Sequence, residues 1–117
     1  MDVINVNGHF VSAEQPVLPV SNRGFRYGDG LFETMRYMNG ELKYLDLHLD
    51  RIRKGMRKLK IEGYSQLDKF FLKEKVEELI RRNKTGQQAR VRLIVYREGD
   101  GLYAPLDNRM GYVLQVS

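Results

Sequence analysis

The sequence contains no cysteine, only two histidines and only three prolines in 117 residues. Without cysteine, a disulfide framework and a thiolate-bound metal site are both excluded. The two histidines, His9 and His48, are too few and too far apart in the sequence to form a convincing metal cluster. We therefore expect no metal site.

The sequence also lacks an apolar run of membrane-spanning length. Its first residues have neither the basic start nor the apolar stretch of a signal peptide. Apolar residues make up 42% and charged residues 30%, which is an ordinary balance for a globular protein. We expect residues 1–117 to form one soluble, cytoplasmic domain with no membrane partner.

The net charge is positive, because the sequence has twenty basic and fifteen acidic residues, and the pI is near 9.6. The excess indicates an affinity for anions, which include nucleic acids, phosphates and carboxylates. A small basic nucleic-acid-binding domain is one interpretation, supported by the interleaving of arginine with tyrosine. The basic residues scatter around the expected helices instead of forming one face, so we do not expect a nucleic-acid partner.

Two Asn-Gly dipeptides mark tight hairpins, because both residue types tolerate a positive φ. The dipeptides are Asn7-Gly8 and Asn39-Gly40. Strands are expected on either side of each dipeptide and again near the carboxyl end, where apolar and polar residues alternate. The expected strands are residues 3–6, 10–13, 31–38, 41–44, 89–97 and 111–117.

Two amphipathic helices are expected between these strands. Apolar residues at +4, +3, +4 and +3 spacing from Leu45 to Leu59 form one helical stripe, with Asp46 as the expected N-cap and Gly63 as the stop. A second helix is expected over residues 66–82. The predicted fold class is therefore α+β, an antiparallel sheet with two amphipathic helices. The side chains expected to face the core from the second helix are Leu67, Phe70, Phe71, Val76, Leu79 and Ile80.

The stretch from Asn22 to Arg36 concentrates glycines, aromatic residues, carboxylates and arginines. Strand alternation puts Phe32 and Arg36 on one face and Leu31, Glu33 and Met35 on the other. Together with Tyr27 in the preceding loop, they would form an aromatic wall beside a cation, suited to an apolar or aromatic carboxylate. The alternative is that Tyr27 and Phe32 belong to the core and Arg36 is a solvated residue.

Arg51 lies on the first expected helix, beside the apolar stripe, at i+3 from His48 and four residues before Gly55. A half-shielded arginine suits bidentate recognition of a phosphate or carboxylate. Gly55, one turn later, would allow a ligand or another backbone to approach closely. The alternative for Arg51 is an ion pair with Asp46 or Asp50.

Arg90 and Arg92 share one face of the strand expected over residues 89–97. Two neighbouring guanidinium groups repel each other unless an anion lies between them. A carboxylate contact and a simple solvated face are equally consistent with this pattern.

Two strings with family-like separation identify a resemblance, Arg23-Gly24-Phe25-Arg26-Tyr27-Gly28-Asp29-Gly30-Leu31-Phe32-Glu33-Thr34-Met35-Arg36 and Leu47-His48-Leu49-Asp50-Arg51-Ile52. They closely resemble the amino-terminal small domain of the class IV aminotransferases. These are pyridoxal-phosphate enzymes of fold type IV, and they include branched-chain and D-amino acid aminotransferases and aminodeoxychorismate lyases. The likeness extends from about Ser21 to the end of the chain.

The resemblance implies a role for five residues. Arg51 matches the arginine that holds the cofactor phosphate in the family. Tyr27, Phe32, Arg36 and Arg92 match residues that line the substrate pocket. Arg90 stands where the branched-chain enzymes have a tyrosine, which weakens a branched-chain assignment. The loop from residue 98 to 105 resembles one that reaches the neighbouring subunit's site in family dimers, so a homodimer is implied.

The resemblance also implies that the reactive lysine of the family is missing from residues 1–117. The family's Schiff-base lysine lies in a second domain, and this sequence ends before the matching region. None of its lysines lies in an apolar pocket of the kind a reactive lysine needs, so we predict no catalytic residue here. Residues 1–117 are interpreted as the small domain of a two-domain aminotransferase, inactive alone.

In the complete enzyme, pyridoxal 5′-phosphate would carry an amino group between an amino acid and a 2-oxo acid. The alternative within the family is aminodeoxychorismate lyase, which eliminates pyruvate with the same cofactor. A stand-alone dimerisation or regulatory module derived from the enzyme fold is the third interpretation.

Overall fold

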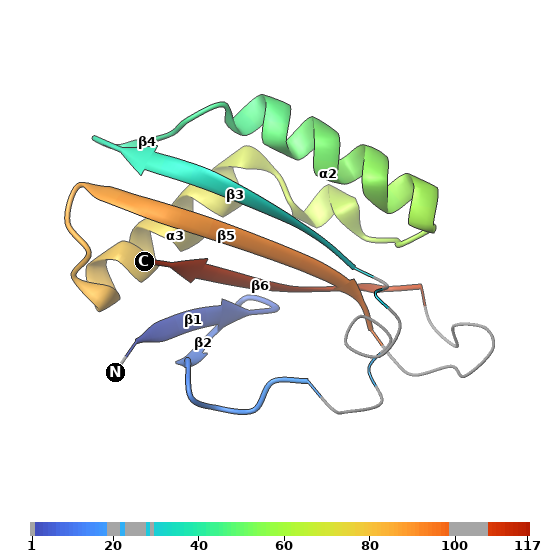
Figure 1. The fold of residues 1–117 in the computed structure, drawn as a ribbon, viewed down its shortest axis with the longest axis horizontal. Helices are drawn as coiled ribbons and strands as arrows, with labels where there is room; N and C mark the ends of the chain where they lie inside the picture. Colours follow the sequence, from blue (N-terminus) through green and yellow to red (C-terminus); the bar gives the residue numbers. More distant parts are fainter. Residues whose placement is uncertain (1, 19–21, 23–27, 29, 99–107) are drawn as a thin grey trace.

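The expected α+β fold is confirmed by the computed structural model, which describes residues 2–18, 22, 28, 30–98 and 108–117. Six antiparallel strands form one sheet in the order β2-β1-β6-β5-β3-β4. Two α-helices lie along one side of this sheet (Figure 1). The strands are β1 (Val3–Val6), β2 (His9–Ser12), β3 (Gly30–Met38), β4 (Glu41–Leu42), β5 (Gln88–Arg97) and β6 (Met110–Val116).

Both Asn-Gly hairpins are confirmed. Asn7 and Gly8 have φ values of 52° and 91° and connect β1 to β2. Asn39 and Gly40 have φ values of 50° and 85° and connect β3 to β4. Positive φ at both turn positions matches the twist of the flanking strands, which explains the choice of these dipeptides.

The first helix, α2 (Leu45–Leu59), covers the predicted apolar stripe, but the predictions for both of its caps were wrong. Tyr44, in the left-handed region at φ 57°, precedes it, and Asp46 lies inside its first turn. The helix ends at Lys60, also left-handed at φ 60°, and not at Gly63. The Ile61 N–H then donates to the Met56 carbonyl at 2.9 Å, and the Ile61 side chain is buried. This Schellman-type ending satisfies the last carbonyls and places an apolar residue in the core.

The second helix, α3 (Lys69–Asn83), begins later than expected, after a short 3₁₀ turn, η1 (Tyr64–Gln66). The Asp68 carboxylate caps it by accepting the Phe71 N–H at 2.8 Å. The buried side of α3 is formed by Leu72, Val76 and Leu79, and Phe70, two residues before Leu72, therefore points away from it and is 76% exposed. The prediction that Phe70 faces the core was therefore wrong, and Leu67 is buried from the turn before the helix.

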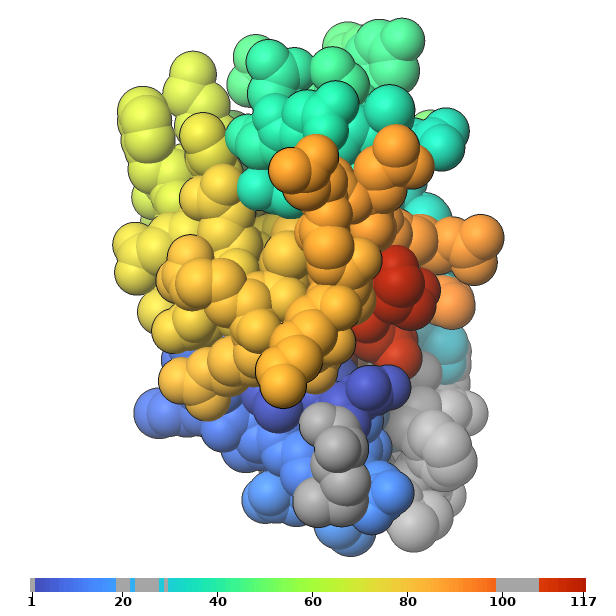
Figure 2. All heavy atoms as spheres, turned by 90° about the vertical axis from the view of Figure 1, so that its left-hand side faces the viewer, coloured from blue at the N-terminus to red at the C-terminus, as the bar shows by residue number. Residues whose placement is uncertain are grey.

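Helices and sheet form two layers with the core between them. From the sheet, Met35, Val91, Leu93 and Leu114 point into this core and are at most 2% exposed. Figure 2, seen end-on, shows the helices on one side and side chains of β5 and β6, in orange and red, projecting on the other. We call this second side of β3, β5 and β6 the open face, because no described helix covers it. Its residues include Phe32, Thr34, Arg36, Arg90, Arg92 and Gln115.

Candidate functional site

Phe32 and Arg92 meet on the open face. Phe32 is 58% exposed, so the interpretation of this residue as part of the core is wrong. The guanidinium carbon of Arg92 lies 4.7 Å from the centroid of the Phe32 ring. The strand register explains the contact, because Thr34 is the direct partner of Arg92 and Phe32 is therefore its diagonal neighbour. A cation held over an aromatic face is attracted by the ring's quadrupole, which orients Arg92 along the sheet.

A cavity of about 240 Å³ opens beside this pair. Its wall is largely apolar, which suits an apolar ligand group lying next to a cation. Tyr27, the third predicted member of this wall, lies outside the described residues. The lining residues are Leu18, Gly28, Gly30, Leu31, Phe32, Arg92, Ile94, Val95 and Tyr96.

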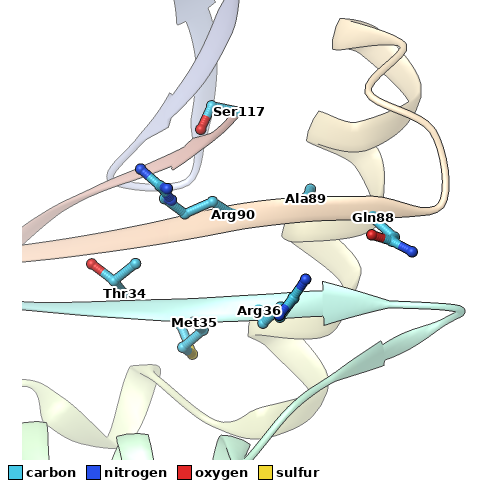
Figure 3. Close-up of a pocket in the computed structure, with 7 residues that line it drawn as sticks. All are labelled: Thr34, Met35, Arg36, Gln88, Ala89, Arg90 and Ser117. Carbon is cyan, nitrogen blue, oxygen red and sulfur yellow. The ribbon is translucent and has the colours of Figure 1, made fainter.

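Arg36 lies farther along β3 and lines a different cavity, of about 520 Å³ (Figure 3). Arg36 and Arg90 are direct cross-strand partners, and both are exposed. Among the described residues, neither forms an ion pair with a carboxylate. Like charges directly opposite each other destabilise a sheet, so this pair favours an anion between them. The predicted substrate residues thus fall into two places, with Phe32 and Arg92 in one and Arg36 in the other.

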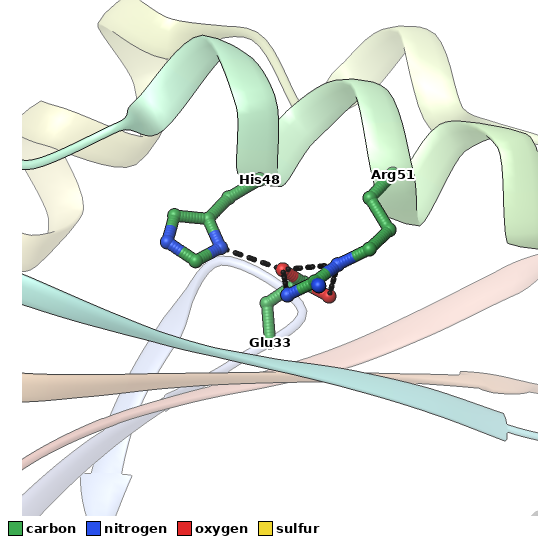
Figure 4. A network of polar contacts seen from close by, with 3 residues as sticks. All are labelled: Glu33, His48 and Arg51. Atoms are coloured by element: carbon green, nitrogen blue, oxygen red, sulfur yellow. Dashed lines mark hydrogen bonds and ion pairs between the residues drawn. The ribbon is translucent and has the colours of Figure 1, made fainter.

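Arg51 lies near the helix-facing side of β3, where it contacts Glu33 (Figure 4). Its Nε atom donates to both carboxylate oxygens of Glu33, at 2.9 and 3.1 Å, and its Nη2 atom donates to Oε1 at 2.6 Å. His48 Nδ1 lies 2.6 Å from the same Oε1 atom. The expectation of an intramolecular ion pair was right, but the partners named for it were wrong, and Asp50 pairs with Lys54 instead.

Glu33 is the member of this candidate site that the sequence analysis did not identify. The signal was present, because alternation placed this carboxylate on the same face as Leu31 and Met35, toward the helices. A charged residue at an inward position requires a partner. Arg51, on the first helix after this strand, was the available cation.

Glu33 is only 6% exposed, and two opposing effects act on its pKa. Burial raises the pKa, whereas hydrogen bonds and charge from Arg51 and His48 lower it. The second effect prevails, so the pKa of Glu33 lies below its ordinary value of 4.5. Glu33 is therefore a carboxylate at neutral pH.

This shift predicts acid destabilisation. A carboxylate whose pKa is lower in the folded state contributes stability above its unfolded pKa, and this contribution is lost as the pH falls through the folded pKa. The free energy of unfolding should therefore decrease below about pH 4.5. Urea unfolding of the wild type and Glu33→Gln at pH 7 and about pH 3 tests this. The difference between the two proteins should shrink in acid; a constant difference would contradict the prediction.

A further cavity, of about 580 Å³, brings Arg51 and Phe32 together at the edge of β3. This edge is accessible because β4 pairs only with Tyr37 and Met38 of β3. Gly55 also lines the cavity, but an added Cβ there would lie 2.8 Å from Leu31 Cδ1. The close approach that Gly55 permits is therefore that of the Leu31 side chain. The other residues around this cavity are Leu31, Glu33, Asp50, Ile52, Lys54 and Lys58.

Within residues 2–18, 22, 28, 30–98 and 108–117, no group of three or more histidine or acidic side chains is arranged to hold a metal ion. Over the same residues, no helix has the length and apolar character needed to cross a membrane.

Comparison with known proteins gives consistent matches. Residues 30–116 match the family described as amino-transferase class IV. The chain is 38% identical over 93 residues to an aminodeoxychorismate lyase of Bacillus subtilis, covering 78% of this chain and 31% of that protein. It is 32% identical over 79 residues to a D-alanine aminotransferase of Listeria monocytogenes, covering 67% of this chain and 26% of that protein. The chain thus spans about a third or less of these curated relatives.

Solved structures share the fold. A branched-chain aminotransferase from Thermoproteus uzoniensis, solved with norvaline, has a TM-score of 0.78 at 19% identity and covers 99% of this chain and 40% of that one. A hypothetical aminotransferase from Mycobacterium tuberculosis, in its pyridoxal-phosphate-bound form, has a TM-score of 0.74 at 21% identity. It covers 98% of this chain and 39% of that one.

Proposed function

This chain belongs to the amino-transferase class IV family, and on that premise we propose that it supplies the phosphate-anchoring and substrate-facing domain of a pyridoxal-phosphate-dependent aminotransferase. The observation that carries the proposal is Arg51, which a buried carboxylate holds beside the cavity that also contains Phe32. The reactive lysine would come from a second domain, which the relatives' greater length accommodates.

Arg51 fits a phosphate group on its geometry. The contacts with Glu33 use Nε and Nη2 on one side of the guanidinium, and Nη1 has no acceptor among the described residues. The outer end of the guanidinium, formed by Nη1 and the second N–H of Nη2, can donate two parallel hydrogen bonds to phosphate oxygens. Pyridoxal phosphate, when bound, would supply the electron sink for chemistry at the substrate's α-carbon. This chain would hold the phosphate and shape the substrate pocket.

The open face supports a substrate with both apolar and anionic groups. Phe32 and the cavity beside it would take the apolar part, and Arg92 is positioned by its contact with the ring to meet a carboxylate. Arg36, paired with Arg90, would meet a second anionic group. The amino donor would be an amino acid and the acceptor a 2-oxo acid. Tyr27 stays in the proposal on its sequence match alone.

Aminodeoxychorismate lyase is the second candidate, favoured by the 38% identity to the Bacillus subtilis lyase. In both candidates Arg51 would hold the cofactor phosphate. They would therefore differ in the substrate that binds at the open face. The homodimer and the cytoplasmic location implied by the sequence also stay predictions.

One test concerns the lysine. Pyridoxal phosphate is mixed with the 117-residue chain, reduced with borohydride and followed by peptide mass spectrometry. We expect no stoichiometric adduct on a single lysine and no transamination, because the reactive lysine would lie in another domain. A saturable adduct at one lysine would contradict the assignment of this chain as the domain without the reactive lysine.

A second test concerns the site itself. Pyridoxamine 5′-phosphate, which has no aldehyde to react with surface lysines, is titrated into ¹⁵N-labelled chain and compared with pyridoxamine. Shifts that require the phosphate should cluster around Arg51 and Phe32, and Arg51→Ala should abolish them. Shifts elsewhere, or shifts that survive in Arg51→Ala, would remove the phosphate anchor and with it the proposed function.

A further inference from the structure

Glu33, which is buried, and His48, which is partly buried, form a brace behind Arg51. Glu33 comes from β3, and His48 and Arg51 come from consecutive turns of α2. The Glu33 side chain is 7% exposed and that of His48 is 18% exposed, whereas the Arg51 side chain is 71% exposed. The charge at the surface is therefore held by groups beneath it (Figure 4).

The brace removes most of the freedom of a long side chain. An unrestrained arginine samples many rotamers, and fixing it upon binding costs conformational entropy. Three hydrogen bonds from Arg51 to one carboxylate fix both the position and the plane of the guanidinium before any ligand arrives. His48 in turn fixes Oε1, the oxygen that accepts from both Nε and Nη2 of Arg51.

Electrostatics alone argues against a carboxylate in this place. The negative charge of Glu33 lies next to Arg51 and repels an incoming phosphate, so a purely electrostatic site would bind phosphate better without it. A benefit from Glu33 can come only from orientation. The two effects have opposite signs, which makes the inference testable.

We propose that Glu33 and His48 are positioning residues for a phosphate site at Arg51, holding the guanidinium side-on so that its outer edge is preorganised for a phosphate monoester. This inference rests on the proposed role of Arg51 and adds two residues to it. The phosphate meets Nη1 and the outer N–H of Nη2, and Glu33 remains bound to the inner edge. Binding therefore requires no exchange of partners at Arg51.

The test measures the ratio of the affinities for pyridoxamine 5′-phosphate and pyridoxamine, by titration of the folded 117-residue chain. Glu33→Gln keeps the shape of Glu33 and removes its charge. It should lower this ratio about tenfold, since one acceptor becomes an NH2 group that cannot accept from Arg51 and the remaining neutral oxygen holds the guanidinium less firmly. His48→Gln should lower it less, because Glu33 still holds Arg51.

Tyr37→Phe is the matched control. The Tyr37 hydroxyl donates to Glu77 Oε2 at 2.8 Å, so this variant also removes a side-chain bond between β3 and a helix, but away from Arg51. Its affinity ratio should equal that of the wild type. The Arg51 Nε–H resonance gives an independent readout, because it should be sharp and slow to exchange in Tyr37→Phe and averaged in Glu33→Gln.

The outcomes separate the two proposals. If Arg51→Ala leaves the ratio unchanged, Arg51 is not the phosphate anchor and the proposed function fails. If Arg51→Ala abolishes the phosphate preference but Glu33→Gln binds as well as the wild type or better, only the positioning role is overturned. A loss in Glu33→Gln that Tyr37→Phe shares equally would assign Glu33 a structural role and would also overturn it.

Discussion

Replacing Arg97 by methionine is expected to lower the free energy of unfolding by about 3 kcal/mol. Arg97 is 4% exposed at the end of β5. Its Nη2 donates to the Leu59 carbonyl, and its Nη1 donates to the Lys60 carbonyl at 3.3 Å and to Asn108 Oδ1 at 2.7 Å. Methionine fills a similar volume but donates nothing, so these acceptors lose a buried partner. A cation at the carboxyl end of α2 also complements the helix dipole.

The loss also affects the candidate site. Arg97 connects the end of α2 to β5, and these two elements carry Arg51 and Arg92. Urea unfolding followed by circular dichroism measures the effect. Arg90→Met is the matched control on the same strand, since Arg90 is exposed and faces Arg36. Its unfolding free energy should stay within about 0.5 kcal/mol of the wild type. Equal losses in the two variants would show that Arg97 contributes no more than a surface arginine.

Leu114→Ala is expected to cost about 3 kcal/mol. Leu114 is fully buried, and its direct partner Leu93 on β5 is 1% exposed. Both point into the core between sheet and helices. Truncation removes apolar contacts and leaves a cavity that the central strands of the sheet cannot easily close.

Gln115→Ala, one residue later, tests which face of β6 is buried. Gln115 is exposed on the open face opposite Arg92, so its replacement should change the unfolding free energy by less than about 0.5 kcal/mol. The contrast between adjacent residues follows from the two-residue period of a strand. If Gln115→Ala cost as much as Leu114→Ala, both faces of β6 would have to be buried in solution.

Sequence periodicity was sufficient for the sheet and most of both helices. Alternation assigned Phe32 and Arg36 to one side of β3 and Leu31 and Met35 to the other, and the structure has the same division. The Asn-Gly pairs located both hairpins because the dipeptide itself requires a particular turn. These signals are local, and a local signal can be read from one sequence.

The helix ends and the polar contacts depend on distant residues and were harder to predict. Phe70 fits an apolar stripe on spacing, but α3 packs on the sheet through Leu72 and Val76, which leaves Phe70 exposed. α2 ends at Lys60, and the next residue, Ile61, is buried in the core. The helix propensity of lysine does not indicate an end at this position. Arg51 was expected to be half-shielded, but its side chain is 71% exposed. Its partner Glu33 is 18 positions away in the sequence. A contact between side chains on two different elements can be predicted only when the arrangement of those elements is known.

The sheet order has a consequence for the way the molecule folds. The central position of β6 means that β1 reaches the rest of the sheet only through a strand made at the other end of the chain, as in the pairing of Val6 with Val113. During synthesis, the first hairpin therefore cannot pair with the rest of the sheet until β3, α2, α3, β5 and then β6 have been made. Closing so long a loop is entropically costly and slows folding. We expect the amino-terminal hairpin to join the sheet only after β6 is available, because β6 is its single neighbour in the sheet outside the hairpin.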